Sequence, residues 1–138
     1  MTGAVYRVRT DGASRGNPGP SAIGVSIEDA EGREIEFHSE AIGRTTNNVA
    51  EYRAVVQGLV MLERLGATRA DFLLDSELVV RQLNGQYRVR DPKMAVLYAE
   101  VVRRKARLGQ ITFRHVPRHE NARADQLANE ALDRGRPD

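Results

Sequence analysis

A long helical segment between strand-like runs constrains the fold more than any other feature of the sequence. The segment from about Thr46 to Leu65 carries apolar residues at helical spacing, and Gly66 stops it. The next run, Ala70–Asp75, is short and almost entirely apolar, as expected for a strand that is buried on both faces. Because a strand–helix–strand crossover joins parallel strands, the chain is predicted to be an α/β protein.

The other elements complete a sheet of five strands. Alternating or β-branched runs predict four more strands, at Val5–Asp11, Ala22–Ile27, Ile35–Ile42 and Gln110–Val116. Further helices are predicted at Glu77–Leu83, from Asp91-Pro92 to Leu108, and at Ala122–Leu132. The first three strands follow one another closely, so we expect an antiparallel meander. We expect one domain over residues 1–133 and a frayed tail over 134–138.

Composition excludes several classes of protein. No apolar run approaches the length of a membrane span, and the N-terminus lacks the pattern of a signal peptide. The chain has no cysteine, which rules out disulfides and thiolate metal sites and fits a cytoplasmic protein. The formal net charge is only +2, which by itself does not indicate a nucleic-acid partner. Nearly all basic residues are arginines, a bias that suits phosphate contacts or reflects genome composition.

Four acidic residues stand where a functional site is expected. Asp11 and Asp75 end two strands that would lie side by side, and ligands of open α/β sheets bind at that edge. Glu51 and Asp125 each head the apolar face of a helix, where an unpaired charge would be costly. Structural roles are the alternatives: Asp11 as a turn acid, Glu51 as a helix-dipole acid and Asp75 as a helix N-cap.

A joint role for the four acids points to metal chemistry. Four clustered carboxylates repel one another unless a cation joins them. Oxygen ligands without cysteine suit a hard divalent ion, Mg²⁺ or Mn²⁺. Two such ions about 3.5–4 Å apart activate water and stabilise the leaving oxygen of a phosphodiester. The residues therefore favour metal-dependent phosphodiester hydrolysis.

Four motifs, spread in order over nearly the whole chain, resemble those of the ribonuclease H type 1 family. They are Thr10-Asp11-Gly12-Ala13-Ser14 with Gly16-Asn17-Pro18-Gly19, then Thr45-Thr46-Asn47-Asn48 with Glu51, then Asp75-Ser76, and finally Glu120-Asn121 with Ala124-Asp125-Gln126-Leu127-Ala128. The resemblance implies a ribonuclease H-like α/β fold. Its five-stranded mixed sheet would have the order 3-2-1-4-5, with helices on both faces.

The resemblance also implies an activity. An endoribonuclease of this family hydrolyses the RNA strand of an RNA–DNA hybrid with two metal ions, leaving 3′-hydroxyl and 5′-phosphate ends. Two Mg²⁺ (or Mn²⁺) ions would be held, with substrate bound, by Asp11, Glu51, Asp75 and Asp125. Contacts to the hybrid are implied for Gly12, Ser14, Asn17, Thr46, Asn47, Asn48, Ser76 and Glu77. Reading 2′-hydroxyls on one strand would distinguish RNA from DNA without reading sequence.

The chain departs from the family pattern in two loops. Many members carry a long basic insertion where this chain has only the short loop Asn84–Arg90, and we expect this short form to lack an N-terminal hybrid-binding domain as well. A basic cluster at Arg103, Arg104 and Arg107 either compensates or is a solvated helix face. His119 aligns with a histidine that aids proton transfer or product release, or it is an exposed residue before the last helix.

Two other functions are consistent with the same residues. One is a related metal-dependent nuclease or strand-transfer enzyme acting on DNA, which the complete set of loop motifs argues against. The other is a non-catalytic nucleic-acid-binding module of the same fold, which would not need all four acids. We expect a monomer with no membrane partner, and double-stranded RNA is a possible second substrate.

Overall fold

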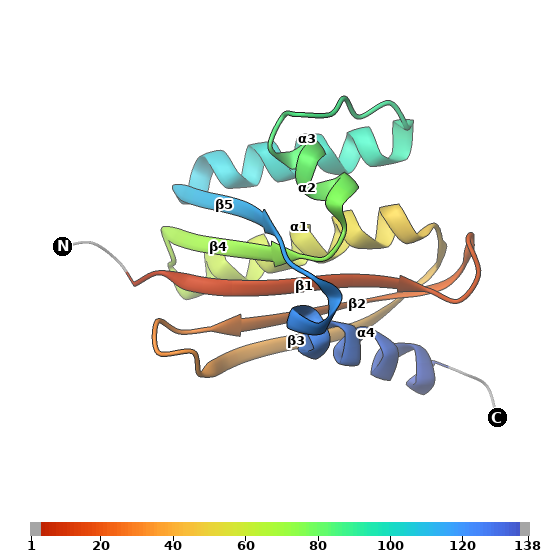
Figure 1. Cartoon of the computed structure of the whole chain (residues 1–138), viewed down its shortest axis with the longest axis horizontal. Coiled ribbons are helices and arrows are strands. Elements are labelled where there is room, and N and C mark those ends of the chain that lie inside the picture. Colours follow the sequence, from red (N-terminus) through yellow and green to blue (C-terminus); the bar gives the residue numbers. More distant parts are fainter. Residues whose placement is uncertain (1–3, 136–138) are drawn as a thin grey trace.

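A computed structural model describes residues 4–135 and contains one five-stranded mixed sheet in the order β3-β2-β1-β4-β5 (Figure 1). The strands are β1 (Tyr6–Ser14), β2 (Gly19–Glu28), β3 (Glu34–Thr45), β4 (Arg69–Leu74) and β5 (Gln110–His115). The helices are α1 (Asn47–Leu65), α2 (Glu77–Leu83), α3 (Pro92–Leu108) and α4 (Ala122–Arg134), with a 3₁₀ turn, η1 (Arg118–Asn121), before α4. The predicted sheet order is confirmed.

Pairing along the sheet follows from the connections. β1, β2 and β3 form an antiparallel meander, whereas β1 pairs with β4, and β4 with β5, in parallel. Helices α2 and α3 join β4 to β5, whereas α1 crosses from β3 to β4, which runs parallel to β3 and pairs with β1. The strand–helix–strand prediction is therefore confirmed.

Helices cover both faces of the sheet. A side chain at Gly12 on β1 would collide with the backbone of α1, and one at Gly24 on β2 would collide with the backbone of α4. Gly24 pairs with Asp11, the residue before Gly12, so these two close approaches lie on opposite faces. Helix α3 packs on α1 in a second layer. The predicted arrangement of helices is thus confirmed.

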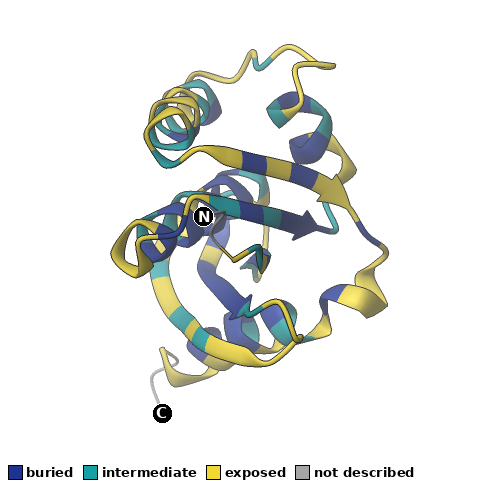
Figure 2. Ribbon diagram, turned by 90° about the vertical axis from the view of Figure 1, so that its left-hand side faces the viewer, coloured by how far each residue is buried: buried dark blue, intermediate teal, exposed yellow. Residues whose placement is uncertain are grey.

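The largest core cluster lies between α1 and the sheet. Its fully buried members include Val8, Tyr52, Leu59 and Phe72, and Phe72 stacks near Phe113 with ring centroids 5.4 Å apart. Figure 2 shows this buried band, and the mostly exposed outer strand β3 in contrast. The core fixes α1, which carries Glu51, against β1, which carries Asp11.

The helix ends follow from capping residues. Thr46 caps α1 by accepting a hydrogen bond from the Val49 N–H, and Gly66 ends the helix in the left-handed conformation, with φ 70°. Asp91 caps α3 ahead of Pro92. The N-cap of α2 is Ser76 and not Asp75, so the alternative structural role considered for Asp75 is wrong.

Strand β1 is longer than its sequence pattern indicates. The prediction ended it at Asp11, but the strand continues to Ser14. It continues because β2 pairs with it as far as Ser14↔Ser21, and this pairing overrides the break that glycine suggests. Asp11 therefore lies inside β1 and not at its end.

The last helix extends two residues further than predicted, to Arg134. Arg134, predicted as the start of the frayed tail, is the last residue of α4, and residues 136–138 lie outside the described part of the chain. Within residues 4–135, no helix has the length and apolar character needed to cross a membrane.

Candidate active site

Two aspartates meet where β1 passes the end of β4. The parallel register pairs Arg9 of β1 with Leu73 of β4, so Asp11 and Asp75 lie side by side two residues further on. Asp11 is only 5% exposed, and Asp75, just beyond the end of its strand, is half-buried. The sequence prediction that these two acids lie together is confirmed, although only Asp75 follows a strand end.

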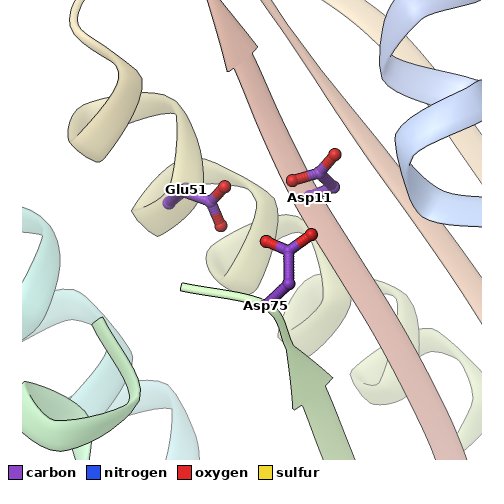
Figure 3. A group of neighbouring side chains, drawn as sticks. All are labelled: Asp11, Glu51 and Asp75. Atoms are coloured by element: carbon purple, nitrogen blue, oxygen red, sulfur yellow. The ribbon is translucent and has the colours of Figure 1, made fainter. Parts of the chain in front are cut away.

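Glu51 reaches the same place from the first turns of α1. It is 3% exposed, and its Oε2 accepts no hydrogen bond within residues 4–135. The close approach of β1 to α1 places it there, because a Cβ at Gly12 would lie 2.2 Å from the Ala50 carbonyl carbon. Carboxylate oxygens of Asp11, Glu51 and Asp75 all lie within 4.8 Å of one another, and the three side chains converge (Figure 3).

Asp125 joins the cluster from α4, on the other face of the sheet. It approaches Asp11 closely enough to contribute to the raised pKa of that residue, and both line one cavity of about 390 Å³. The same cavity is lined by Glu51, Asp75 and two cations, Arg15 and Arg118. All four predicted acids therefore face one cavity.

Burial and mutual repulsion disfavour full ionisation of this cluster. Burial, followed by the charge of Glu51, raises the pKa of Asp11 to about 10. Burial also raises the pKa of Glu51 to about 7, against the opposing effect of a hydrogen bond with Asp11. Burial raises the pKa of Asp75 above its usual value, and a hydrogen bond from the Asn121 amide offsets part of this effect. Such a cluster is stabilised by a bound cation, and its hard oxygen donors fit Mg²⁺ or Mn²⁺.

The residues predicted to contact substrate surround the cavity. Gly12, Ser14 and Asn47 line it. Asn17 lies next to Asn47, because its Oδ1 accepts a hydrogen bond from the Asn47 N–H at 3.0 Å. Thr46, before Asn47, uses its hydroxyl to cap α1. These residues gather where the β1–β2 turn meets the start of α1.

The other predicted contacts lie further along α1 and at α2. Asn48 is half-buried on α1, and the Ser76 hydroxyl accepts a hydrogen bond from the Val79 N–H at the start of α2. Glu77 is exposed, with its Oε1 3.8 Å from the Arg81 Nε. Nothing in the geometry of these three residues tests contact with a nucleic acid, so their roles stay predictions.

The loop before α4 presents an arginine to the cavity. His119 lies in η1 and outside the cavity lining, with its Nε2 3.9 Å from the Glu120 Oε2. Its neighbour Arg118 lines the cavity, and its Nη2 lies 3.9 Å from the Asp125 Oδ1. The sequence prediction singled out His119 and missed Arg118, which carried no signal beyond its position next to His119.

Two asparagines near the cavity were not predicted as site residues, although Asn121 belongs to the last of the four sequence motifs. Asn129 lines the cavity, and its side chain donates to the Asp125 carbonyl at 2.9 Å. Its spacing of four residues from Asp125 places it on the same helix face, a signal that the sequence did contain. Asn121 is buried and donates to the Thr10 carbonyl at 2.9 Å, which fixes η1 against β1.

A mixed sheet in this order, with clustered carboxylates where β1 passes the end of β4, defines the ribonuclease H-like class of α/β proteins. The family described as Reverse transcriptase-like matches residues 9–131. The chain is 43% identical over 127 residues to Bifunctional protein Rv2228c of Mycobacterium tuberculosis, covering 91% of this chain and 35% of that protein. It thus spans about a third of the length of that relative.

Two solved structures are similar over almost their whole length. RNase H1 from the halophilic archaeon Halobacterium salinarum superposes with a TM-score of 0.92 at 37% identity, covering 95% of this chain and 99% of that one. LC11-RNase H1, solved in complex with an RNA/DNA hybrid, has a TM-score of 0.90 at 42% identity, covering 94% and 97%. The chain belongs to the ribonuclease H family.

Proposed function

We propose that this chain is an endonuclease that hydrolyses the RNA strand of RNA–DNA hybrids and leaves 3′-hydroxyl and 5′-phosphate ends. The observation that carries the proposal is the convergence of Asp11, Glu51 and Asp75, whose carboxylate oxygens lie within 4.8 Å of one another. Support for the substrate comes from LC11-RNase H1, which was solved with an RNA/DNA hybrid.

The carboxylates have the chemistry that a pair of Mg²⁺ or Mn²⁺ ions requires. Asp11, Glu51 and Asp75 offer hard oxygen donors, and the buried Glu51 Oε2 accepts no hydrogen bond within residues 4–135. Asp125, across the cavity, would complete the set of ligands. When bound, two divalent ions activate water and stabilise the leaving oxygen of a phosphodiester.

The protein's own residues supply position and charge. All four acids line the cavity that would admit the scissile phosphate; Asp11 and Glu51 are buried, and Asp75 and Asp125 are half-buried. Arg118 places a cation beside Asp125, where it would help to bind the phosphate. Water is the proposed nucleophile, so no side chain forms a covalent intermediate.

Selection of the hybrid would rest on the rim of the cavity. Asn17, Asn47 and Asn48 present amide groups where the β1–β2 turn meets α1, and Thr46 caps the same helix. Amides donate to and accept from ribose 2′-hydroxyls, which DNA lacks. We propose that these contacts across the minor groove identify the RNA strand, with Gly12, Ser14, Ser76 and Glu77 as further contacts.

We also propose that the domain acts as a cytoplasmic monomer with the hybrid as its partner. Size-exclusion chromatography with light scattering tests the monomer. A labelled double-stranded RNA, incubated beside the hybrid, tests whether that duplex is a second substrate.

The function is tested with matched duplexes of one sequence. Wild-type protein is incubated with an RNA–DNA hybrid, a DNA duplex and a double-stranded RNA, each strand labelled in turn, in Mg²⁺, in Mn²⁺ and with chelator. We expect metal-dependent cleavage of the RNA strand of the hybrid and an intact DNA duplex. Cleavage of the DNA duplex would favour a DNA nuclease, and hybrid binding without turnover would favour a binding module.

A further inference from the structure

We propose that Arg15 is a phosphate-binding residue for the RNA strand and that Asp133 holds its guanidinium until the strand binds. The proposal deepens the proposed function and rests on it, because it assigns a further contact to the same cavity. Arg15 was not among the residues that the sequence assigned to the site.

Arg15 lies on the rim of the cavity that the four carboxylates line. It stands in the turn between β1 and β2, and its Nη2 forms an ion pair with the Asp133 Oδ1 at 2.7 Å. The two side chains are 38% and 64% exposed, so a ligand that enters the cavity can reach the guanidinium. Asp133 belongs to the last turn of α4.

The ion pair is not needed to shape the turn that carries Arg15. The Arg15 N–H donates to the Pro20 carbonyl at 2.8 Å, and the Ser14 hydroxyl contacts the Thr45 carbonyl at 3.2 Å. On the far side of the turn, Asn17 accepts from the N–H of Asn47 at 3.0 Å. None of these bonds involves the guanidinium, which is therefore available for another role.

An incoming phosphate is a better partner for Arg15 than Asp133 is. Exposed ion pairs contribute little to stability, so the existing pair is easily exchanged. The planar guanidinium matches two phosphate oxygens at once, and such charge-assisted bonds are among the strongest hydrogen bonds. Asp133 also lies at the C-terminal end of its helix, where the helix dipole disfavours a negative charge.

The spacing along α4 places Arg15 some distance from the cleaved phosphate. Asp125 and Asp133 are eight residues apart, about 12 Å along the helix axis. Arg118 lies at the Asp125 end and Arg15 at the Asp133 end, so the two arginines bracket the cavity. Phosphates of one strand repeat every 3.4 Å or so of duplex axis, so a strand cleaved at the carboxylates would place a phosphate about three to four nucleotides away near Arg15.

The salt dependence of hybrid binding distinguishes the role of Arg15 from that of Asp133. Affinity for a labelled hybrid is measured against KCl concentration in an Asp75→Asn background, which blocks cleavage. In Arg15→Ala, the loss of one phosphate contact should make the negative slope of log K against log salt concentration shallower by roughly 0.7–0.9. Arg15→Lys should retain the slope with weaker affinity. Asp133→Asn should keep the slope and bind no more weakly than the parent, because it only frees Arg15.

The proposal is overturned if Arg15→Ala and Asp133→Asn weaken binding equally and leave the slope unchanged. That result would show that the ion pair only stabilises the local structure. The wild-type protein is assayed for hybrid cleavage in parallel. Absence of cleavage overturns the proposed function, whereas cleavage with an unchanged slope in Arg15→Ala overturns only the role of Arg15.

The strand assignment is tested with hybrids in which a single phosphate is replaced by an uncharged methylphosphonate. Replacements are made one at a time along the RNA strand, and one at about three to four nucleotides from the cleaved position should weaken binding in the parent but not in Arg15→Ala. If binding depends on Arg15 in this way only for a replacement in the DNA strand, Arg15 does not contact the RNA strand.

Discussion

Among single residues, the neighbours Arg118 and His119 are expected to respond oppositely to substitution by alanine. Both side chains are largely exposed, 82% and 80%, but Arg118 lines the cavity and His119 does not. We expect Arg118→Ala to lower kcat at least tenfold, since a cation near the phosphate is lost. We expect His119→Ala to leave kcat within about twofold, since a proton-transfer residue must lie within reach of the reacting group. Steady-state hybrid cleavage between about pH 6 and pH 9 measures kcat for both variants. A reduced kcat in His119→Ala, with a normal kcat in Arg118→Ala, would show that His119 and not Arg118 takes part in the reaction.

Buried acids also make the metal-free protein sensitive to pH. Folding raises the pKa of Asp11 from 3.8 to about 10 and that of Glu51 from 4.5 to about 7. The folded state then binds more protons than the unfolded state, so the stability due to these groups is complete below about pH 4 and is lost as the pH rises through the folded-state values. In chelator, Tm should therefore fall from about pH 5 to pH 9.

Asp11→Asn is the matched variant for this effect. Asparagine is neutral without taking up a proton on folding, so the Tm of the variant in chelator should fall less with pH, and at about pH 8 the variant should be more stable than wild type by on the order of 1–3 kcal/mol. Added Mg²⁺ should stabilise wild type more than the variant, and more at high pH, because its ligands must be deprotonated. A wild-type Tm that rises with pH in chelator would contradict the burial argument.

The sequence allowed the acids to be identified but not all of their neighbours. In the sequence, Asp11 and Asp75 follow strand-like apolar runs, and Glu51 and Asp125 head apolar helix faces, where an unpaired charge is costly. Arg118 carried no such signal, because an exposed arginine before a helix is ordinary. Its approach to Asp125 depends on how η1 crosses the sheet, which no local pattern encodes.

Among the elements, the contact between β1 and α1 determines where Glu51 lies. A Cβ at Gly12 would lie 2.2 Å from the Ala50 carbonyl carbon and 2.3 Å from the Glu51 backbone nitrogen, so strand and helix must separate in Gly12→Ala. We expect a loss of about 1–3 kcal/mol in stability and, because Glu51 moves with its helix, a fall in kcat of roughly a hundredfold. Urea unfolding and hybrid cleavage measure the two effects.

Gly32→Ala is the control for that substitution. Gly32 also disfavours a side chain, since its φ is +83°, but an added Cβ meets no atom within 4 Å. It should therefore cost about 1–2 kcal/mol of stability with kcat unchanged. Equal losses of kcat in both variants would mean that stability, and not the position of Glu51, controls activity.

Element boundaries show where local signals fail. The helices from Asn47, Glu77 and Pro92 end where their capping and periodicity predict, at Leu65, Leu83 and Leu108. The strand β1 was predicted too short because Gly12 reads locally as a break. Its continuation depends on pairing with β2, and its glycine is needed for contact with α1, both of which are tertiary effects.

For the whole molecule, the direction of α3 decides which arginines can reach a hybrid. The helix begins at the loop over residues 84–91 and ends beside the start of β5 (Figure 1). The carboxylates lie at the opposite, carboxyl edge of the parallel strands, about 20 Å from that end of α3 for a six-residue strand. Arg104 and Arg107 are instead paired with Glu63, at 3.6 and 3.2 Å.

We therefore expect the loop, and not the helix cluster, to contribute to hybrid binding. Arg88→Ala with Arg90→Ala should weaken binding and lower its salt dependence, because both side chains are exposed on the loop. Arg104→Ala with Arg107→Ala should leave the salt dependence unchanged and lower only Tm. Binding isotherms at several salt concentrations compare the two double variants, and the reverse result would restore the helix cluster as a substrate contact.

The sheet order could be predicted because it follows from connections. Three closely spaced strands give a meander, and each helical crossover leads to a strand parallel to the one that it leaves, which leaves few arrangements. The role of the basic cluster on α3 could not be predicted in this way. Its partner Glu63 is some forty residues away in sequence, and only the packing of α3 on α1 brings the two together.

The central claim is that the clustered carboxylates direct metal-dependent hydrolysis of the RNA strand. The most direct test is end-group analysis of a hybrid, labelled in both strands, after incubation with Mg²⁺ and equal amounts of wild type or Asp75→Asn. The account predicts RNA fragments with 3′-hydroxyl and 5′-phosphate ends, an intact DNA strand, and no products from a folded Asp75→Asn or from wild type with chelator. Products with 2′,3′-cyclic ends, or equal cleavage by Asp75→Asn, would contradict it.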